Sequence, residues 1–229
     1  MPFDWWYNDR QQVGLDFDDE AQVSTYDIRQ AGSAERDREL LRHLGVSADM
    51  AVADIGCGTG ILICEAARTC KSALGIDISH AMLSAAKARA EGLGCDNLTF
   101  QQAGFLSFDA PEGVFDLITA KNALHHLPDF WKAMAFSRIY ATLKPGGRLY
   151  IRDVMFSGPP QHLAKAVEGW IDWLAANTGY SREEGASHVR DEYSTFAWAI
   201  ERMLNDCGFR VVEHTLSGVY GTFIAERAP

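Results

Sequence analysis

The sequence predicts a single α/β domain built around a mostly parallel β-sheet. Its 229 residues, 47% of them hydrophobic, are enough to bury one substantial core. From about Met50 onward, short apolar segments rich in β-branched residues alternate with longer segments typical of helices. This alternation indicates βαβ units, in which successive strands run parallel and a helix crosses between them.

The elements expected in the first half of the chain begin with a helix over residues 33–44. Ser33 is a suitable N-cap, Glu35 lies in the first turn, and Gly45 is typical of a helix end. The apolar segment 50–55 then predicts a strand that is buried on both faces. We expect a helix, a strand, a second helix and a second strand to follow, over residues 61–70, 72–77, 79–92 and 97–102.

The second half of the chain continues the alternation and ends in a hairpin. A strand over 115–120 leads into a loop, and Pro128 and Asp129 suit the start of the next helix. The segment Lys144-Pro145-Gly146-Gly147 predicts the end of that helix and a turn. A strand, a last helix and two hairpin strands are expected over 148–156, 194–206, 209–215 and 219–226.

A glycine-rich turn lies between the first strand and its helix, in Asp54-Ile55-Gly56-Cys57-Gly58-Thr59-Gly60. Glycine is needed where the backbone takes a positive φ or where a ligand approaches without meeting a Cβ. A second acid, Asp77, ends the next strand 17 residues after Gly60. The dinucleotide fingerprint G-x-G-x-x-G would need a glycine at position 61, where the chain has Ile61. The pattern is therefore G-x-G-x-G, typical of a nucleoside-binding turn of another kind.

This pattern resembles motif I and the ribose-binding acid of class I S-adenosylmethionine-dependent methyltransferases. The loop Lys121-Asn122-Ala123-Leu124-His125-His126-Leu127-Pro128 resembles the loop after strand four in small-molecule members, such as the ubiquinone and menaquinone methyltransferases. The segment 143–149, Leu-Lys-Pro-Gly-Gly-Arg-Leu, matches a further structural motif. The resemblance covers about residues 48–227. It implies a Rossmann-like three-layer sandwich with a mostly parallel seven-stranded sheet and a C-terminal antiparallel hairpin.

The resemblance also implies S-adenosyl-L-methionine as cofactor and assigns residues to it. Asp54 is expected to order the turn and meet the amino group, and a carboxylate such as Asp77 offers two acceptor oxygens to the two ribose hydroxyls. The family usually has an acid after strand three that binds the adenine, whereas this chain has Ala103-Gly104-Phe105. The expected cofactor-binding set is Tyr26, Arg29, Asp54, Gly56, Cys57, Gly58, Gly60, Asp77, Ile78, Met82, Gly104, Phe105 and Lys121.

Alternatives remain open for several of these residues. Met82 resembles the apolar residue that lies against adenine, but a plain core methionine fits the sequence equally well. Tyr26 and Arg29 match an N-terminal Tyr-Asp-x-Arg pattern in which the guanidinium can pair with the cofactor carboxylate. A solvated arginine on a helix surface is the alternative.

Methyl transfer from a sulfonium is an in-line displacement that depends mainly on alignment and on the exclusion of water. His125 and His126 are the candidate general bases, because imidazole accepts protons near neutral pH. The alternative is that they only cap backbone groups or pack. Arg152 can hold an ionic group of the acceptor, or form a surface pair with Asp153. The other expected acceptor-binding residues are Trp5, Trp6, Tyr193 and Trp198, which can equally belong to the core.

Two segments depart from the regular alternation within the expected domain, 33–229. Residues 1–32 are irregular but aromatic, and disordered segments are poor in aromatics. We therefore expect an arm that folds back over the cofactor site. Residues 157–192 carry tryptophans among charges, and we expect a helical lid there that determines the acceptor.

Composition limits the partners. A formal charge of −10 and a pI near 5.1 disfavour nucleic acid, because neutralising phosphates needs clustered basic residues. No apolar run approaches the roughly 20 residues that span a bilayer, and no secretory signal opens the sequence, so we expect a cytoplasmic protein without a membrane partner. Five cysteines without a C-x-x-C pair support neither a disulfide framework nor a zinc cluster. The sequence also lacks a catechol-type metal arrangement, and we expect no metal.

The sequence therefore predicts an enzyme that methylates oxygen, nitrogen or sulfur of a small molecule. Two other functions remain open. One is a non-catalytic protein that binds the same cofactor or its demethylated product. The other is an NAD-dependent oxidoreductase, which the residue at position 61 disfavours. The sequence does not determine the oligomeric state.

Overall fold

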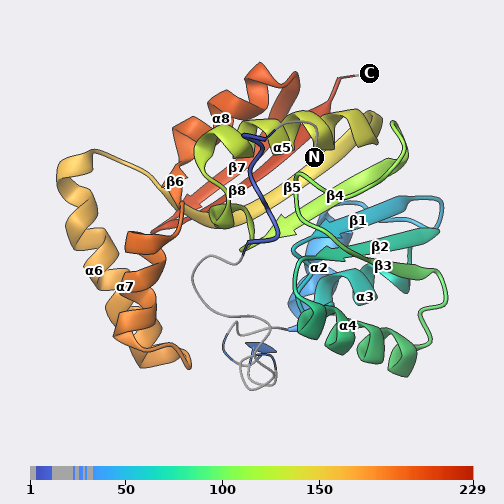
Figure 1. Cartoon of the computed structure of the whole chain (residues 1–229), viewed down its shortest axis with the longest axis horizontal. Coiled ribbons are helices and arrows are strands. Elements are labelled where there is room, and N and C mark those ends of the chain that lie inside the picture. Colours follow the sequence, from blue (N-terminus) through green and yellow to red (C-terminus); the bar gives the residue numbers. More distant parts are fainter. Residues whose placement is uncertain (1–3, 12–22, 24–25, 28, 30–32, 229) are drawn as a thin grey trace.

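The sheet of this protein follows the order β3-β2-β1-β4-β5-β8-β7 (Figure 1). The computed structural model describes residues 4–11, 23, 26, 27, 29 and 33–228. Strands β1 to β5 run parallel, and β8 is antiparallel to both β5 and β7. A short eighth strand, β6, pairs with β5. The bounds are β1 Ala51–Ile55, β2 Ser72–Asp77, β3 Leu98–Gln102, β4 Phe115–Lys121, β5 Leu143–Phe156, β6 Thr195–Phe196, β7 Phe209–Ser217 and β8 Tyr220–Arg227.

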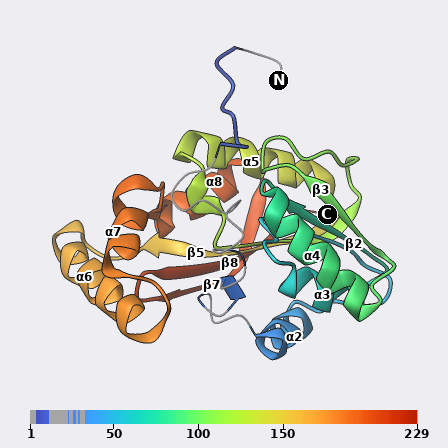
Figure 2. The same cartoon turned by 60° about the horizontal axis from the view of Figure 1, so that its bottom comes forward.

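Helices cover both faces of this sheet, with α2, α3 and α4 on one face and α5 and α8 on the other (Figures 1 and 2). Two more helices, α6 and α7, stand beyond the end of β5 (Figure 2). The bounds are α2 Ala34–His43, α3 Ile61–Ala67, α4 His80–Leu93, α5 Asp129–Thr142, α6 Pro160–Asn177, α7 Arg182–Asp191 and α8 Ala197–Asp206. The predicted three-layer sandwich with a C-terminal antiparallel hairpin is confirmed.

The hydrophobic core is divided by the sheet. On one face, Phe136 of α5 and Leu204 of α8 are buried against the strands. On the other face, Ile63 of α3 and Leu83 of α4 belong to a second buried cluster. Strands buried on both faces carry continuous apolar residues, which is why β1 and β4 show no polar alternation. This packing fixes the strand ends where the functional loops begin.

Several element boundaries differ from the sequence prediction, and two of these differences come from strand pairing. Strand β5 begins at Leu143 instead of residue 148, because Leu143 pairs with Phe115 across a register shift in β4. Helix α8 begins at Ala197 instead of residue 194, because Thr195 and Phe196 pair with the end of β5. Both differences arise from strand pairing between distant segments, which local sequence signals do not contain.

Helices α6 and α7 form the segment that the sequence predicts as a lid. Trp170, Ile171 and Leu174 of α6 pack in a small separate cluster with Val154 of β5 and Val219 of the final hairpin. A capping box between Ser181 and Glu184 starts α7. Of the helices that the structure describes, none has both the length and the apolar character needed to cross a bilayer.

The predicted N-terminal arm lies largely outside the described residues, which include 4–11, 23, 26, 27 and 29 of it. Among these, Trp5, Trp6 and Tyr7 have their rings within 6.0 Å of Trp131 on α5. Asp9 accepts hydrogen bonds from the Leu106 amide, at 2.6 Å, and from the Ser107 hydroxyl. The first described stretch is therefore fastened next to the loop that follows β3.

Candidate active site

The turn between β1 and α3 depends on glycine at Gly56. Its φ is +73°, and a Cβ placed there would overlap the Cβ of Ala123 in the loop after β4. Any side chain would push these two loops apart. Gly58 has a φ of +52°, and its backbone N–H donates to Asp77. The turn therefore presents bare backbone at the carboxyl ends of the central strands, where ligands of open α/β sheets bind.

Gly60 has a different physical role from the one predicted. A Cβ at this position would lie 2.9 Å from the Cβ of Ala86 on α4. The absence of a side chain thus allows α3 and α4 to pack closely, and Gly60 is also the N-cap residue of α3. It borders neither of the two cavities described below.

Asp77 stands at the end of β2 with its carboxylate fixed by two backbone amides. Gly58 N–H donates to Oδ2 at 2.8 Å, and Ser79 N–H donates to Oδ1 at 2.9 Å. Each carboxylate oxygen has two acceptor sites, so a carboxylate can accept from more than two donors at once. The side chain borders the main cavity.

Asp54 is buried at the end of β1. The hydroxyl of Thr119 on the neighbouring strand β4 donates to its Oδ1 at 2.6 Å. Burial is the largest influence on this carboxyl group and raises its pKa to about 7, against the opposing effects of Thr119 and Lys121. Asp54 therefore changes charge near neutral pH.

A cavity of about 480 Å³ starts at this turn and continues to helices α6 and α7. Twelve residues expected from the sequence to bind cofactor, to bind acceptor or to act in catalysis border it: Tyr26, Arg29, Gly56, Gly58, Asp77, Ile78, Met82, Gly104, Phe105, His125, His126 and Arg152. A second cavity of about 300 Å³ on the α2 side is bordered by Asp54, Cys57 and Lys121.

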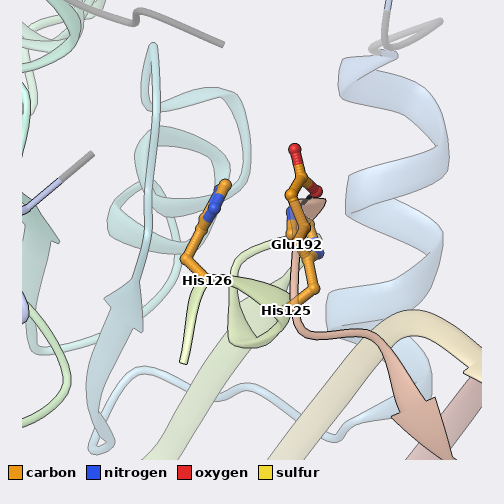
Figure 3. Close-up of side chains that lie close together, drawn as sticks. All are labelled: His125, His126 and Glu192. Atoms are coloured by element: carbon orange, nitrogen blue, oxygen red, sulfur yellow. Dashed lines mark ion pairs between the residues drawn. The ribbon is translucent and has the colours of Figure 1, made fainter. Parts of the chain in front are cut away.

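Two histidines reach the main cavity from the short 3₁₀ helix η1, Leu124–His126, which follows β4. Nδ1 of His125 lies 2.6 Å from Oδ1 of Asp153, and the amides of Leu124 and His125 donate to Oδ2 of the same carboxylate. Asp153 therefore fixes both the loop and the ring of His125. His126 extends beside it from the same loop (Figure 3).

The charges of this pair follow from their surroundings. Burial by itself would lower the pKa of His125, but Asp153 and Glu192 outweigh it and raise that pKa. Burial would likewise raise the pKa of Asp153, but His125 and the Val154 amide bring it down to about 2. Asp153 is thus ionised at neutral pH and stabilises positive charge on His125.

Comparisons with known proteins identify the family. A family model described as a methyltransferase domain matches residues 52–147. An uncharacterised methyltransferase of Bacillus pumilus is 30% identical over 201 residues, which are 78% of this chain and 92% of that protein. The chain belongs to the class I S-adenosylmethionine-dependent methyltransferases.

Two further matches agree with this assignment. Phosphoethanolamine N-methyltransferase 1 of Triticum aestivum is 34% identical over 183 residues, covering 76% of this chain and 36% of that protein. A crystal structure of a SAM-dependent methyltransferase from Aquifex aeolicus superposes with a TM-score of 0.66 at 18% identity, covering 91% of this chain and 98% of the other. S-adenosylmethionine is therefore the cofactor, and family membership argues against the NAD-dependent oxidoreductase.

The residues of this methyltransferase fit that cofactor. The backbone at Gly56 and Gly58 borders the main cavity, and so does the fixed carboxylate of Asp77. Ile78, Met82, Gly104 and Phe105 border the same cavity. A carboxylate that accepts hydrogen bonds suits the hydroxyl groups of a ribose, and apolar surfaces suit an adenine ring.

Arg29 of the methyltransferase contacts the lid. Its guanidinium forms an ion pair with Glu184 of α7 and lies 4.2 Å from the ring centroid of Tyr180. Asp27 accepts from the Thr59 hydroxyl in the glycine turn, and Arg89 of α4 pairs with it at 2.5 Å. The alternative of a solvated surface arginine is wrong, because Arg29 joins the arm to α7.

Lys121 and Arg152 also have protein partners. Lys121 pairs with Asp37 of α2 at 2.5 Å, and of the two cavities formed by the described residues it borders the second. Arg152 donates to the Asn122 side chain at 2.9 Å and lies 4.5 Å from the Tyr220 ring centroid. The alternative pairing of Arg152 with Asp153 is therefore wrong, since Asp153 binds His125 instead.

Four aromatic residues expected to bind the acceptor lie elsewhere, since the cavity formed by the described residues is not bordered by Trp5, Trp6, Tyr193 or Trp198. Trp5 and Trp198 are 57% and 67% exposed. Tyr193 is fixed through its backbone, whose N–H donates to the His125 carbonyl. Their hydrophobicity gave no information on which side of the domain they face.

Several residues that border the cavity were not named individually among the expected site residues, although most of them lie in the segment 157–192 that was expected to determine the acceptor. Those on or near the lid helices and the final hairpin are Trp170, Trp173, Tyr180, His188, Glu192 and Tyr220. One signal was available, because His188 and Glu192 are four residues apart and such residues face each other on a helix. The others were hidden, because only folding brings α6 and α7 against the end of β5.

Proposed function

We propose that this methyltransferase methylates an oxygen, nitrogen or sulfur atom of a small molecule held beneath helices α6 and α7. The observation that supports it is the continuous cavity from the glycine turn to those helices. Its volume of about 480 Å³ is in the range of roughly 300–1,000 Å³ typical of small-molecule sites. The Triticum aestivum relative, named for phosphoethanolamine, supports an acceptor of this size class.

The two ends of the cavity suit different tasks. S-adenosylmethionine supplies a methyl group on a positively charged sulfur. We assign Asp77 to its ribose and Gly56 and Gly58 to close backbone contact. Asp54 borders the second cavity, which Gly56 also borders, and we assign it to the amino group of the cofactor. The acceptor end lies between η1, Arg152 and the aromatic residues of α6. Holding both partners in line while excluding water provides most of the rate enhancement that such a displacement needs.

The arm and the lid close this arrangement. We propose that residues 157–192 cover the acceptor and that the arm covers the cofactor. Tyr26 supports this role, because its ring lies over Gly58, 3.3 Å from the position of a Cβ there. The Arg29–Glu184 pair links the arm to α7.

His125 and His126 are the proposed catalytic residues. Because Asp153 binds Nδ1 of His125, the other ring nitrogen, Nε2, is left to take a proton from an acceptor hydroxyl, thiol or ammonium group. His126 borders the same end of the cavity. The ring centroids of His125 and His126 are 4.3 Å apart, so the two rings can face the same acceptor atom.

Replacing the catalytic histidine with alanine is expected to lower kcat by about 100-fold or more, the usual contribution of a positioned base. The variants His125→Ala and His126→Ala show which of the two residues is the base. If that residue acts only on the acceptor, its alanine variant should bind S-adenosylhomocysteine as tightly as the wild-type protein does. Steady-state kinetics with a methyl acceptor measure the effect. Unchanged turnover in both variants would exclude proton removal by either ring.

Cofactor affinity is expected to rise with pH through the titration of Asp54. Since its pKa is about 7, the carboxyl is mostly neutral at pH 6 and mostly ionised at pH 8. Only the ionised form attracts the ammonium group of the cofactor, so affinity should fall by up to about tenfold per pH unit below 7 and level off above it. Calorimetry with S-adenosylhomocysteine between pH 6 and 8 measures this, and Asp54→Asn should remove the dependence.

Labelled cofactor tests the acceptor class directly. The protein is incubated with methyl-labelled S-adenosylmethionine and, separately, with a small-metabolite extract, a protein fraction and total RNA. The proposal predicts release of S-adenosylhomocysteine with label only in the metabolite fraction. Label in protein or RNA would contradict the proposed acceptor, and a protein that binds the cofactor without turnover with any fraction would be a non-catalytic binder.

The charge and the thiols support the proposed setting. A net charge of −10 opposes binding to the phosphate backbone of nucleic acids, which supports the exclusion of DNA and RNA as partners. All five cysteines are free thiols and four are buried. Unpaired cysteines are typical of proteins in reducing compartments, and we propose the cytoplasm.

A further inference from the structure

Three side chains at the acceptor end of the cavity converge on one point. Their nitrogen and carboxylate oxygen atoms all lie within 4.8 Å of one another, in His125, His126 and Glu192 (Figure 3). The two histidines come from η1, and Glu192 follows α7. His125 is buried and the other two are partly buried. Folding thus brings two imidazoles and a carboxylate together from separate segments.

His125 has the orientation of a metal ligand. Its Nδ1 is bound to Asp153 at 2.6 Å, and its Nε2 faces Oε2 of Glu192 at 3.4 Å. When Nδ1 carries the proton, Nε2 and the carboxylate are both acceptors, and a cation between them would satisfy both. Two ligands of a tetrahedral ion with bonds of about 2.1 Å are themselves roughly 3.4 Å apart. The observed separation therefore suits a shared metal ion.

Glu192 is also held from outside the cluster. Nδ1 of His188 forms an ion pair with its Oε2, and Nε2 of His188 lies 3.0 Å from the Ser194 hydroxyl. The side chain of Glu192 is only 7% exposed. Protein metal sites have such outer partners, because these fix the ring and carboxylate orientations of the ligands. Here Asp153 orients His125, and His188 orients Glu192.

We propose that His125, His126 and Glu192 bind a divalent transition-metal ion, with zinc as the best match. Imidazole and carboxylate ligands suit zinc and its first-row neighbours. Three protein ligands leave a coordination position open, as in catalytic sites. All three residues border the main cavity, so the open position faces the acceptor end. The expectation of no metal considered a cysteine cluster and a catechol-type pattern, and this cluster resembles neither.

The site changes how the acceptor would be activated, and this part rests on the proposed function. An acceptor hydroxyl or thiol bound to the ion would have a lower pKa than in water and would release its proton to the solvent before methyl transfer. Nε2 of His125 is then a ligand and no longer accepts that proton. His125 therefore cannot bind the metal and act as the base at the same time. If the metal activates the acceptor, removing it with a chelator should lower turnover. If His125 acts as the base, it should not.

Zinc titration of the full chain tests the site without any acceptor. After stripping with a chelator, the protein should bind one equivalent of Zn²⁺ in calorimetry, and Co²⁺ should give the visible absorption of a four- or five-coordinate ion. Glu192→Gln and His126→Ala should each weaken zinc binding by about 100-fold or more. Replacing the outer partners of metal ligands already costs about 10–100-fold in affinity, and these variants change the ligands themselves. His162→Ala, which removes an exposed imidazole on α6, should leave it unchanged.

Two results would overturn the metal site. One is the absence of a saturable one-to-one isotherm in the wild-type protein, and the other is equal affinity in Glu192→Gln. Binding of S-adenosylhomocysteine by the same samples shows that the variants are folded. The same measurement separates the two proposals. A failure to bind S-adenosylhomocysteine contradicts the proposed function, whereas the zinc titration alone decides the metal site.

Discussion

Asp77→Asn is expected to weaken the binding of S-adenosylhomocysteine by about 100-fold. A hydrogen bond to a charged group contributes roughly 1.5–3 kcal/mol, so losing the charge opposite two ribose hydroxyls costs about 3 kcal/mol. The amide also brings a donor next to the N–H groups of Gly58 and Ser79, which now donate to the carboxylate. The loss should therefore appear in both affinity and thermal stability.

Calorimetry with S-adenosylhomocysteine measures the affinity, and thermal unfolding without ligand measures the stability. Asp96→Asn is the matched control, because it makes the same chemical change at an exposed position after α4. It should alter neither quantity. If Asp77→Asn bound the ligand as tightly as wild type, Asp77 would not be the ribose-binding residue.

Gly56→Ala is expected to destabilise the fold by about 2–5 kcal/mol and to abolish cofactor binding. Left-handed backbone costs a residue with a side chain roughly 1–2 kcal/mol, and overpacking adds about 1–3 kcal/mol. Here the added methyl group would overlap Ala123, so the β1–α3 turn and the loop after β4 must separate. That movement displaces the backbone next to the cofactor and the start of η1.

Gly45→Ala isolates the backbone part of this effect. Gly45 has a φ of +74°, almost the same as Gly56, but a Cβ there meets nothing within 4 Å. It should cost only about 1–2 kcal/mol, or roughly 2–8 °C in Tm for a chain of this size, with cofactor binding intact. Equal Tm losses in the two variants would show that contact with Ala123 is unimportant. Thermal unfolding and calorimetry measure both.

The cofactor end of the site was accessible from the sequence because its signals are local. The glycines of the β1–α3 turn and the acid that ends β2 lie within 25 residues, and their roles follow from backbone geometry and carboxylate chemistry. Ser79 could also be expected to cap α4, since the preference of a hydroxyl for an N-cap is a local property. Even here the sequence predicted cofactor contact for Gly60, whereas the structure shows that this glycine allows close packing against Ala86. Ala86 is on another helix, so no local signal indicates the contact.

The acceptor end was not accessible in the same way. Trp5 and Trp198 were predicted to line it because they are aromatic, but they lie on other surfaces. Trp170, Tyr180 and Glu192, which do border it, are on or beside the inserted helices α6 and α7. No local signal states where an insertion will pack, since that depends on contacts with distant strands.

The sequence by itself determined the α/β architecture, the family and the cofactor, because periodicity, turn chemistry and short motifs act over a few residues. Only the tertiary structure decided which histidine is fixed by Asp153, that Arg29 pairs with Glu184 of α7, and that Glu192 joins the two histidines of η1. These contacts join residues far apart in the chain. Their geometry is set by how helices and strands pack, and so it exists only in the folded protein.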